Sequence, residues 1–153
     1  MQYLITFLIS MVPVIELRGA IPYGIGFDLN PWVVYLLATL GNLLPVPFIL
    51  LFIRQFFEWM KKYPRLGKIA IKLEERAAKK SGRVKASEFI GLLLFVAIPL
   101  PGTGAWTGAL IAALMEMRIK KALTSIASGV LIAGIIVTLV AVLGIEALSF
   151  VLG

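Results

Sequence analysis

Cysteine and histidine are both absent from this chain of 153 residues, and acidic residues are few, with 8 Asp and Glu against 15 Lys and Arg. Without cysteine there is no disulfide and no thiolate nucleophile. Without histidine there is no imidazole general base, no Ser-His or Cys-His pair, and the commonest metal ligand is missing. We therefore expect a protein that is not an enzyme, with no catalytic residue, no metal site and no cofactor.

Apolar residues are abundant instead. They make up 60% of the chain, and the mean hydropathy is +0.98. A soluble domain of this length cannot bury so much apolar surface, so the sequence predicts a membrane protein. Four apolar stretches follow one another, at about residues 3–27, 32–57, 89–115 and 122–152. The second and fourth can each cross a bilayer as one helix, which takes about 20 residues.

The first and third stretches are interrupted. The first contains VIELRGAIPYG, in which Glu16 and Arg18 lie between Pro13 and Pro22, and the third contains PLPGTG at residues 99–104. Irregular backbone at membrane depth is tolerated only where it is buried in protein or lines a cavity. Both interruptions therefore predict the tip of a helical hairpin, although the first stretch also fits a kinked full span. The residues expected to shape the tips are Pro13, Gly19, Pro22, Pro99, Pro101 and Gly102.

The basic residues indicate the topology. Residues 58–88 hold ten of the fifteen Lys and Arg, and a second cluster, Arg118, Lys120 and Lys121, follows the third stretch. Lys and Arg concentrate in cytoplasmic loops, so both clusters are expected on the cytoplasmic side. That placement requires the third stretch to enter the membrane and return on the same side. Within the linker, apolar residues recur at helical spacing, at Leu66, Ile69, Ala70, Leu73 and Ala77. This spacing predicts a helix that lies on an anionic membrane face, or a loop helix surrounded by solvent.

These observations predict an all-α, multi-pass protein of the cell (plasma or inner) membrane, with one membrane domain over residues 1–153. Residues 1–57 form a re-entrant hairpin plus a span, residues 58–88 a basic cytoplasmic linker helix, and residues 89–153 a second hairpin plus span. The two halves then have opposite orientations, as in the inverted repeats of secondary transporters. Gly104, Gly108 and Ala112 are four residues apart, a spacing that favours close internal helix packing over a dimer contact.

The two tips are expected to meet near the bilayer midplane and to form the functional site. A charged residue at that depth is costly and marks a site with a partner. Arg18 is predicted to bind substrate, and Glu16, removed from water, to take up and release a proton; the alternative is a purely structural ion pair. Thr103, Gly104 and Trp106 are also predicted to bind substrate, with Thr103 capping a helix whose free amides attract an anion.

Two motifs resemble a known family. ELRGAIPYGI at residues 16–25 and PLPGTGAWTGALIAAL at residues 99–114 resemble the small multidrug export protein family over nearly the whole chain. That family is distantly similar to the DedA membrane proteins with a VTT domain, which have paired re-entrant hairpins and are implicated in moving lipids, including polyprenyl phosphates. PLPG at residues 99–102 matches the DedA Pro-x-Pro-Gly-Glu pattern up to Thr103, and Arg18 is similar to an arginine of the other DedA hairpin. The order of the two hairpins is reversed here.

Three functions follow from these patterns. The resemblance and Arg18 favour a DedA-like transporter or flippase for an anionic substrate, such as a polyprenyl phosphate or phospholipid, with or without proton coupling. The alternatives are a small multidrug exporter that exchanges protons for lipophilic cations, and a structural or lipid-scrambling module without a specific site. The expected partners are membrane lipids, a phosphate-headed lipid or small-molecule substrate and a second copy in a homodimer, but no nucleic acid.

Overall fold

The computed structural model describes residues 1–64, 67–69, 71–72, 75 and 87–152. The described residues form seven helices and no strand, as expected for an all-α protein. The helices are α1 (Gln2–Met11), α2 (Glu16–Gly26), α3 (Pro31–Leu43), α4 (Val46–Lys61), α6 (Ser87–Ala97), α7 (Ala105–Leu114) and α8 (Ile119–Leu152). The predicted linker helix, with Leu66, Ala70, Leu73 and Ala77, falls largely outside the described residues.

Two of the helical segments are long and apolar enough to cross a membrane. They are Pro31–Lys61, which comprises α3 and α4, and Ile119–Ala147, the greater part of α8, with 31 and 29 residues. The fourth apolar stretch therefore forms one long helix, as predicted, whereas the second forms a long helical segment made of two helices. The other four helices have only 10 or 11 residues. At about 1.5 Å per residue, each is about half as long as a bilayer core is thick.

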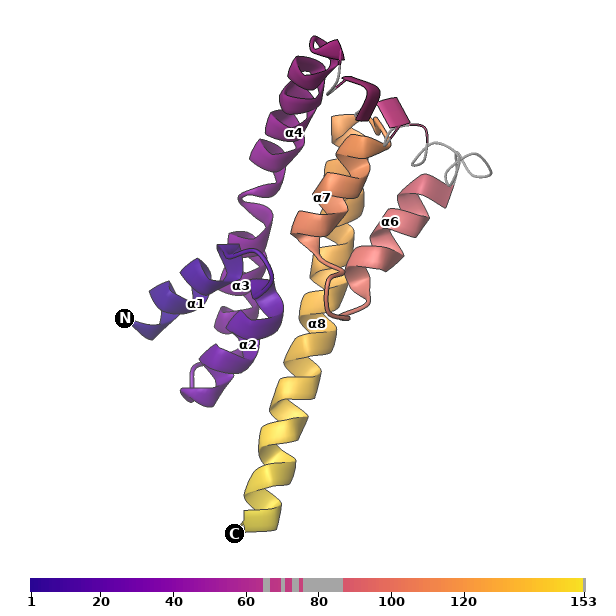
Figure 1. The fold of residues 1–153 in the computed structure, drawn as a ribbon. Helices are drawn as coiled ribbons and strands as arrows, with labels where there is room; N and C mark the ends of the chain where they lie inside the picture. Colours follow the sequence, from indigo (N-terminus) through magenta and orange to yellow (C-terminus); the bar gives the residue numbers. More distant parts are fainter. Residues whose placement is uncertain (65–66, 70, 73–74, 76–86, 153) are drawn as a thin grey trace.

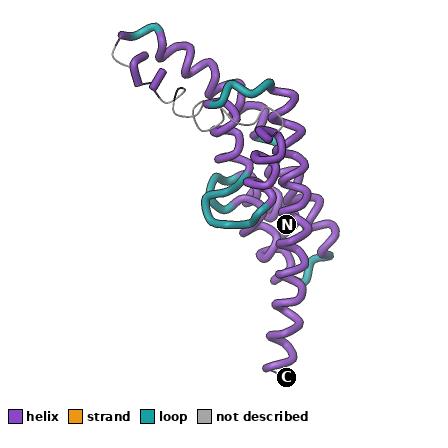
Figure 2. Tube along the Cα trace, turned by 90° about the vertical axis from the view of Figure 1, so that its right-hand side faces the viewer, coloured by secondary structure: helices purple, strands orange, loops and turns teal. Residues whose placement is uncertain are grey.

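The helices gather into two groups that meet in the middle of the molecule. In Figure 1, α1, α2 and α3 pack together on one side, and α6 and α7 pack with α8 on the other. The groups are joined where α2 and α3 pack on α8 and where α4 packs on α7. In Figure 1, α8 continues beyond the other helices toward the C-terminus, and Figure 2 shows the same projecting end from the side. The turn between α1 and α2 and the turn between α6 and α7 both lie in the central region.

The first turn lies earlier than the sequence predicted. It covers residues 12–15, and Gly19 and Pro22 are inside α2, so their assignment to the tip was wrong. Val12 has ψ of 128°, the extended conformation favoured before a proline, and Pro13 therefore ends α1. Pro22 sits in the seventh position of α2, where its ring removes one helical hydrogen bond without ending the helix.

The second turn agrees with the prediction. Helix α6 ends at Ala97 and α7 begins at Ala105, so the Pro-x-Pro-Gly motif forms the connection. Gly102 has φ of +80°, a left-handed conformation that glycine adopts without steric cost. A break not foreseen separates α3 from α4 at Leu44 and Pro45. Pro45 and Pro47 both lack the amide needed to continue a helix, which explains that break.

Small residues set the spacing of the helices. Ala20, Ala38, Ala109 and Ala112 are fully buried, and Gly108 lies against Val96. The prediction that Gly108 and Ala112 serve internal packing is thus confirmed. Backbones can approach closely at such residues, which stabilises helix contacts where lipid removes the hydrophobic driving force. Large apolar side chains point outward instead, including Leu40, Phe48, Phe52, Leu139, Val140 and Leu143, a surface suited to lipid.

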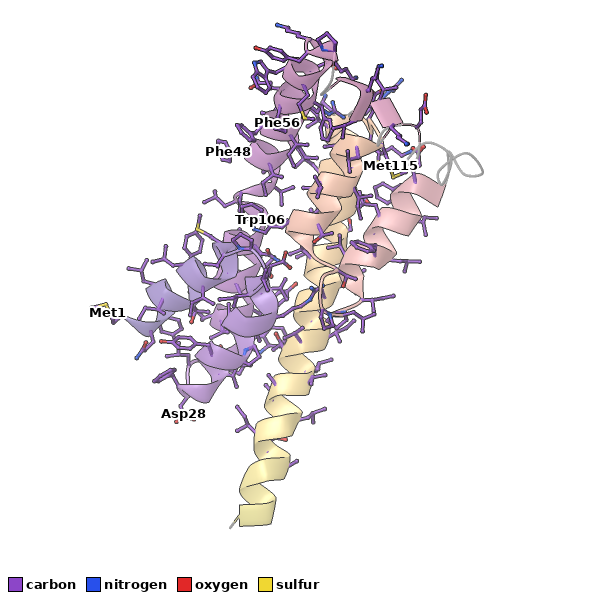
Figure 3. All side chains as sticks on the ribbon, viewed as in Figure 1. Met1, Asp28, Phe48, Phe56, Trp106 and Met115 are labelled. Atoms are coloured by element: carbon purple, nitrogen blue, oxygen red, sulfur yellow. The ribbon has the colours of Figure 1, made fainter. Side chains whose placement is uncertain are left out.

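Two ion pairs show that the start of the basic linker and the second basic cluster lie at the same end of the molecule. Lys61, at the end of α4, lies 3.6 Å from Glu116 in the α7–α8 turn. Lys121 lies 3.3 Å from Glu88 at the start of α6. In Figure 3, Phe56 and Met115 lie toward this end of the molecule and Asp28 toward the other. The start of the 58–88 linker and the 118–121 cluster therefore share one end, as the topological argument required.

Substitution at two glycines of α8 tests this packing. A Cβ on Gly129 would lie 2.7 Å from Val96 Cβ and 2.8 Å from the Leu93 carbonyl oxygen, whereas one on Gly144 meets nothing within 4 Å. We expect Gly129→Ala to lower the free energy of unfolding by about 1–3 kcal/mol through overpacking. Gly144→Ala should leave it unchanged or raise it by up to about 1 kcal/mol. Thermal unfolding in detergent measures both, and equal stabilities would contradict the close α6–α8 contact.

Candidate functional site

The two turns are joined through a carboxylate at the start of α2. Glu16 Oε1 accepts a hydrogen bond of 3.2 Å from the backbone amide of Trp106, the second residue of α7. The first amides of a helix have no partner within the helix, and the helix dipole makes that end positive. The carboxylate of Glu16, in the first hairpin, therefore caps α7 of the second hairpin. Glu16 is 4% exposed, so this contact lies inside the protein.

Gly104 makes room for this cap. It is the N-cap residue of α7, with extended backbone at φ of −157°, so its conformation does not require glycine. A Cβ at this position would instead overlap the carboxylate of Glu16. Gly104 thus belongs to the site through the space it leaves for Glu16.

Arg18 makes the second link between the turns. Its Nη2 donates to Thr103 Oγ1 at 3.0 Å and lies 3.4 Å from the Ile98 carbonyl oxygen. Its Nη1 lies 3.8 Å from Glu16 Oε2, an ion pair without a short hydrogen bond. The fork of the guanidinium therefore faces the second turn. The structure brings together all five residues predicted to form the site: Glu16, Arg18, Thr103, Gly104 and Trp106.

Thr103 does not cap α7, and that prediction was wrong. The cap residue is Gly104, with no side-chain cap of its own, and the Thr103 hydroxyl turns back into the loop. Its Oγ1 lies 2.7 Å from the Ile98 carbonyl oxygen and accepts from the Leu100 amide at 3.2 Å. The physical reason is that the Glu16 carboxylate already occupies the end of the helix. The amide of Trp106 therefore binds Glu16 here and is not open to an anionic substrate.

Trp106 connects the second turn to the end of α1. Its Nε1 donates at 3.2 Å to the carbonyl oxygen of Met11, the last residue of α1. In Figure 3 its ring lies between the α1–α2 group and α7. The ring also borders an apolar groove of about 660 Å³, lined by Met11, Leu44, Pro45, Phe48, Ile49, Phe52, Ile53, Trp106, Thr107 and Leu110. Trp106 is thus both a packing residue and a groove-lining one.

A second groove opens at Arg18. Its volume is about 620 Å³, and among the residues that the structure describes Arg18 is the only charged one that lines it. One wall comes from α2 and the second turn and the other from α8, through Pro22, Gly26, Pro99, Ile136, Val137, Val140, Ala141, Gly144 and Ile145. An apolar channel with a cation at one point suits a molecule with a long apolar part and an anionic group.

Asn42 is a site residue that the sequence analysis missed. It is 1% exposed on α3 and lines a small interior cavity with Glu16, Arg18 and Gly104. A signal was present, because Asn42 is the only amide side chain between Trp32 and Ile53. A polar side chain within an apolar span faces the bundle interior more often than lipid, and such residues mark functional positions.

The fold and the site define a helical membrane protein in which two charged residues of one short helical hairpin meet polar groups of a second hairpin in the interior. A family model described as "Putative small multi-drug export protein" matches residues 16–136. The chain therefore belongs to this family and is a membrane transport protein. No curated protein and no solved structure matches the chain.

Replacing Glu16 tests whether the cap stabilises the joined hairpins. Glu16→Leu removes the acceptor for the Trp106 amide and the charge opposite Arg18, so we expect a loss of about 3–5 kcal/mol in unfolding free energy. Glu16→Gln keeps the acceptor and should lose about 1 kcal/mol. The control, Glu58→Gln, alters an exposed pair with Lys61 and should change stability by less than about 1 kcal/mol. Equal effects of all three in thermal unfolding would contradict the cap.

Proposed function

We propose that the protein moves an amphiphile with an anionic head group across the membrane, through a site between two re-entrant hairpins. The observation that carries the proposal is the apolar groove of about 620 Å³ that opens at the Arg18 guanidinium. An arginine fork binds phosphate oxygens with two parallel hydrogen bonds, and the apolar walls suit acyl or prenyl chains. A polyprenyl phosphate or an anionic phospholipid has both parts.

Helix lengths support the re-entrant arrangement. Helices α1, α2, α6 and α7 have 10 or 11 residues each, too few to cross the bilayer. The two hairpins contact each other at their turns through Glu16, Arg18, Thr103 and Trp106. Their irregular backbone is thus covered by protein, the condition for unwound segments at membrane depth.

Order along the chain supports an inverted repeat. In each half a hairpin of two short helices precedes a long helical segment. Hairpin α1–α2 precedes α3–α4, and hairpin α6–α7 precedes α8. In Figure 1, α3–α4 rises toward the end near Lys61, whereas α8 descends from that end. Opposite orientations of equivalent units are the arrangement of many transporters, whose substrates bind near the midplane. With basic residues on the cytoplasmic side, the turn between α2 and α3 lies outside.

Cysteine labelling tests this topology in a chain that has no native cysteine. We expect Lys62→Cys and Lys120→Cys to react with an impermeant thiol reagent only from the cytoplasmic side, and Trp32→Cys only from the outside. All three positions are exposed in the structure. Labelling of positions 62 and 120 from opposite sides would show that α6 and α7 cross the membrane.

A specific observation also favours drug export, the second candidate. The groove of about 660 Å³ is lined by Met11, Phe48, Phe52 and Trp106, and such side chains accommodate lipophilic cations. The family description fits this activity as well. Glu16 would then exchange a proton for the drug. Against this, Glu16 already contacts Arg18 and the Trp106 amide, which leaves less of its charge for a cation.

Substitution of Arg18 separates these functions. In proteoliposomes we expect Arg18→Gln to slow the movement of fluorescent phosphatidic acid by more than about 10-fold, since hydrogen bonds to a charged group contribute about 1.5–3 kcal/mol. Arg18→Lys keeps the charge but loses the fork, and should slow it less. The measurement is the fraction of label that dithionite reaches over time, with Arg118→Gln as the control because Arg118 is exposed at the α7–α8 turn.

Three outcomes decide between the candidates. Selective movement of phosphatidic acid over phosphatidylcholine, lost in Arg18→Gln, supports the anionic substrate. Equal movement of both lipids in wild type and Arg18→Gln indicates a scrambling module without a specific site. Uptake of tetraphenylphosphonium driven by a pH gradient, and abolished in Glu16→Gln, indicates drug export. That the protein is not an enzyme, that membrane lipids are its partners and that it forms a homodimer all stay predictions.

A further inference from the structure

The side-chain oxygen of Asn42 is a buried hydrogen-bond acceptor without a donor. This atom, Oδ1, has no hydrogen-bond partner, and the whole residue is 1% exposed. Leaving such an acceptor unpaired is costly, and unpaired groups in a native interior call for an explanation. An apolar residue of similar size would pack in the same place on α3 without that cost.

Arg18 carries the complementary atom. Its Nε is also buried and without a partner, although both of its Nη atoms have contacts. Arg18 and Asn42 line the same small interior cavity, together with Glu16, Leu17 and Gly104. A residue with an unpaired N–H donor, on α2, and a residue with an unpaired oxygen acceptor, on α3, therefore line one cavity.

We propose that Asn42 is a positioning residue whose Oδ1 accepts the Nε–H of Arg18 when the two Nη atoms bind the head group of the substrate. The inference rests on the proposed function. In the present structure the fork of Arg18 contacts Thr103, the Ile98 carbonyl oxygen and Glu16. A phosphate that takes over the fork breaks the link to the second hairpin. The hydrogen bond to Asn42 then holds the guanidinium within the α1–α2–α3 group.

The chemistry of the amide suits this task. The guanidinium has five N–H donors in a fixed plane, so a partner at Nε orients the Nη fork toward the groove. A neutral acceptor orients the arginine without cancelling its charge. Glu16 already supplies one negative charge beside Arg18, and a second carboxylate at position 42 would make the site repel an anion.

Asn42→Leu and a matched control test the proposal with dodecyl phosphate as the probe. We expect Asn42→Leu to weaken the binding of dodecyl phosphate by about 10- to 100-fold, the loss of one hydrogen bond to a charged group, while the protein without ligand unfolds at an unchanged or higher temperature. The control is Thr39→Val, since Thr39 Oγ1 is buried on the same helix, also without a partner, but does not line the cavity. It should bind the probe as the wild type does.

The double variant identifies Arg18 as the partner. Lysine has no Nε–H in a guanidinium plane, so Asn42→Leu should have no further effect on binding in an Arg18→Lys background. A non-additive effect of this kind is not expected from a merely structural Asn42. If Asn42→Leu fails to fold, Asn42→Ala takes its place in the same cycle.

Each result has one meaning. If the wild type binds dodecyl phosphate and Asn42→Leu or Asn42→Ala binds it equally well, the role of Asn42 is wrong and the proposed function stands. The role is also wrong if the loss is the same in the Arg18→Lys background, or if Thr39→Val weakens binding as much. If the wild type binds dodecyltrimethylammonium and not dodecyl phosphate, the proposed function fails, and this inference with it.

Discussion

The contact between the Glu16 carboxylate and the first turn of α7 is the interaction on which the arrangement of the hairpins depends. It joins residues 90 positions apart and pairs a buried negative charge with the positive end of a helix. Gly104 leaves the space, and the turn before Glu16 is held in a costly conformation, with Val14 at φ of 78° and Glu16 at φ of 51°. Such backbone persists only where surrounding contacts hold it.

The same contact shapes the chemistry of Arg18. The guanidinium shares Glu16 with the amide of Trp106, and its distance of 3.8 Å from Oε2 leaves the ion pair loose. Its charge is therefore only partly compensated where the apolar groove opens. The residues that join the hairpins are also the ones that a substrate head group would engage. If Arg18 binds a substrate head group as proposed, its contact with Thr103 in the second hairpin competes with that binding.

Much of the fold was predictable because it depends on local chemistry. Apolar length identified the two long helices, and Pro99, Pro101 and Gly102 marked the second turn. The first turn was misplaced because Pro22 was read as a breaker, although one missing amide inside α2 can be tolerated. The break at Pro45 was missed because the run was judged by its apolar length, although Pro45 and Pro47 marked the place. Of the site residues, the sequence analysis identified Glu16 and Arg18 by their charge and overlooked the neutral Asn42.

The sequence by itself determined that the chain is apolar enough for a membrane, which segments carry positive charge and where the second turn lies, since hydropathy, charge and backbone freedom belong to each residue. Only the tertiary structure decided which groups are partners. Thr103 and Glu16 both had the chemistry to cap α7, and the approach of the first hairpin gave that place to Glu16. Asn42 and Arg18 share a cavity because α2 and α3 pack side by side and α8 closes the space between them. Contacts of this kind depend on packing between distant segments, which no local pattern records.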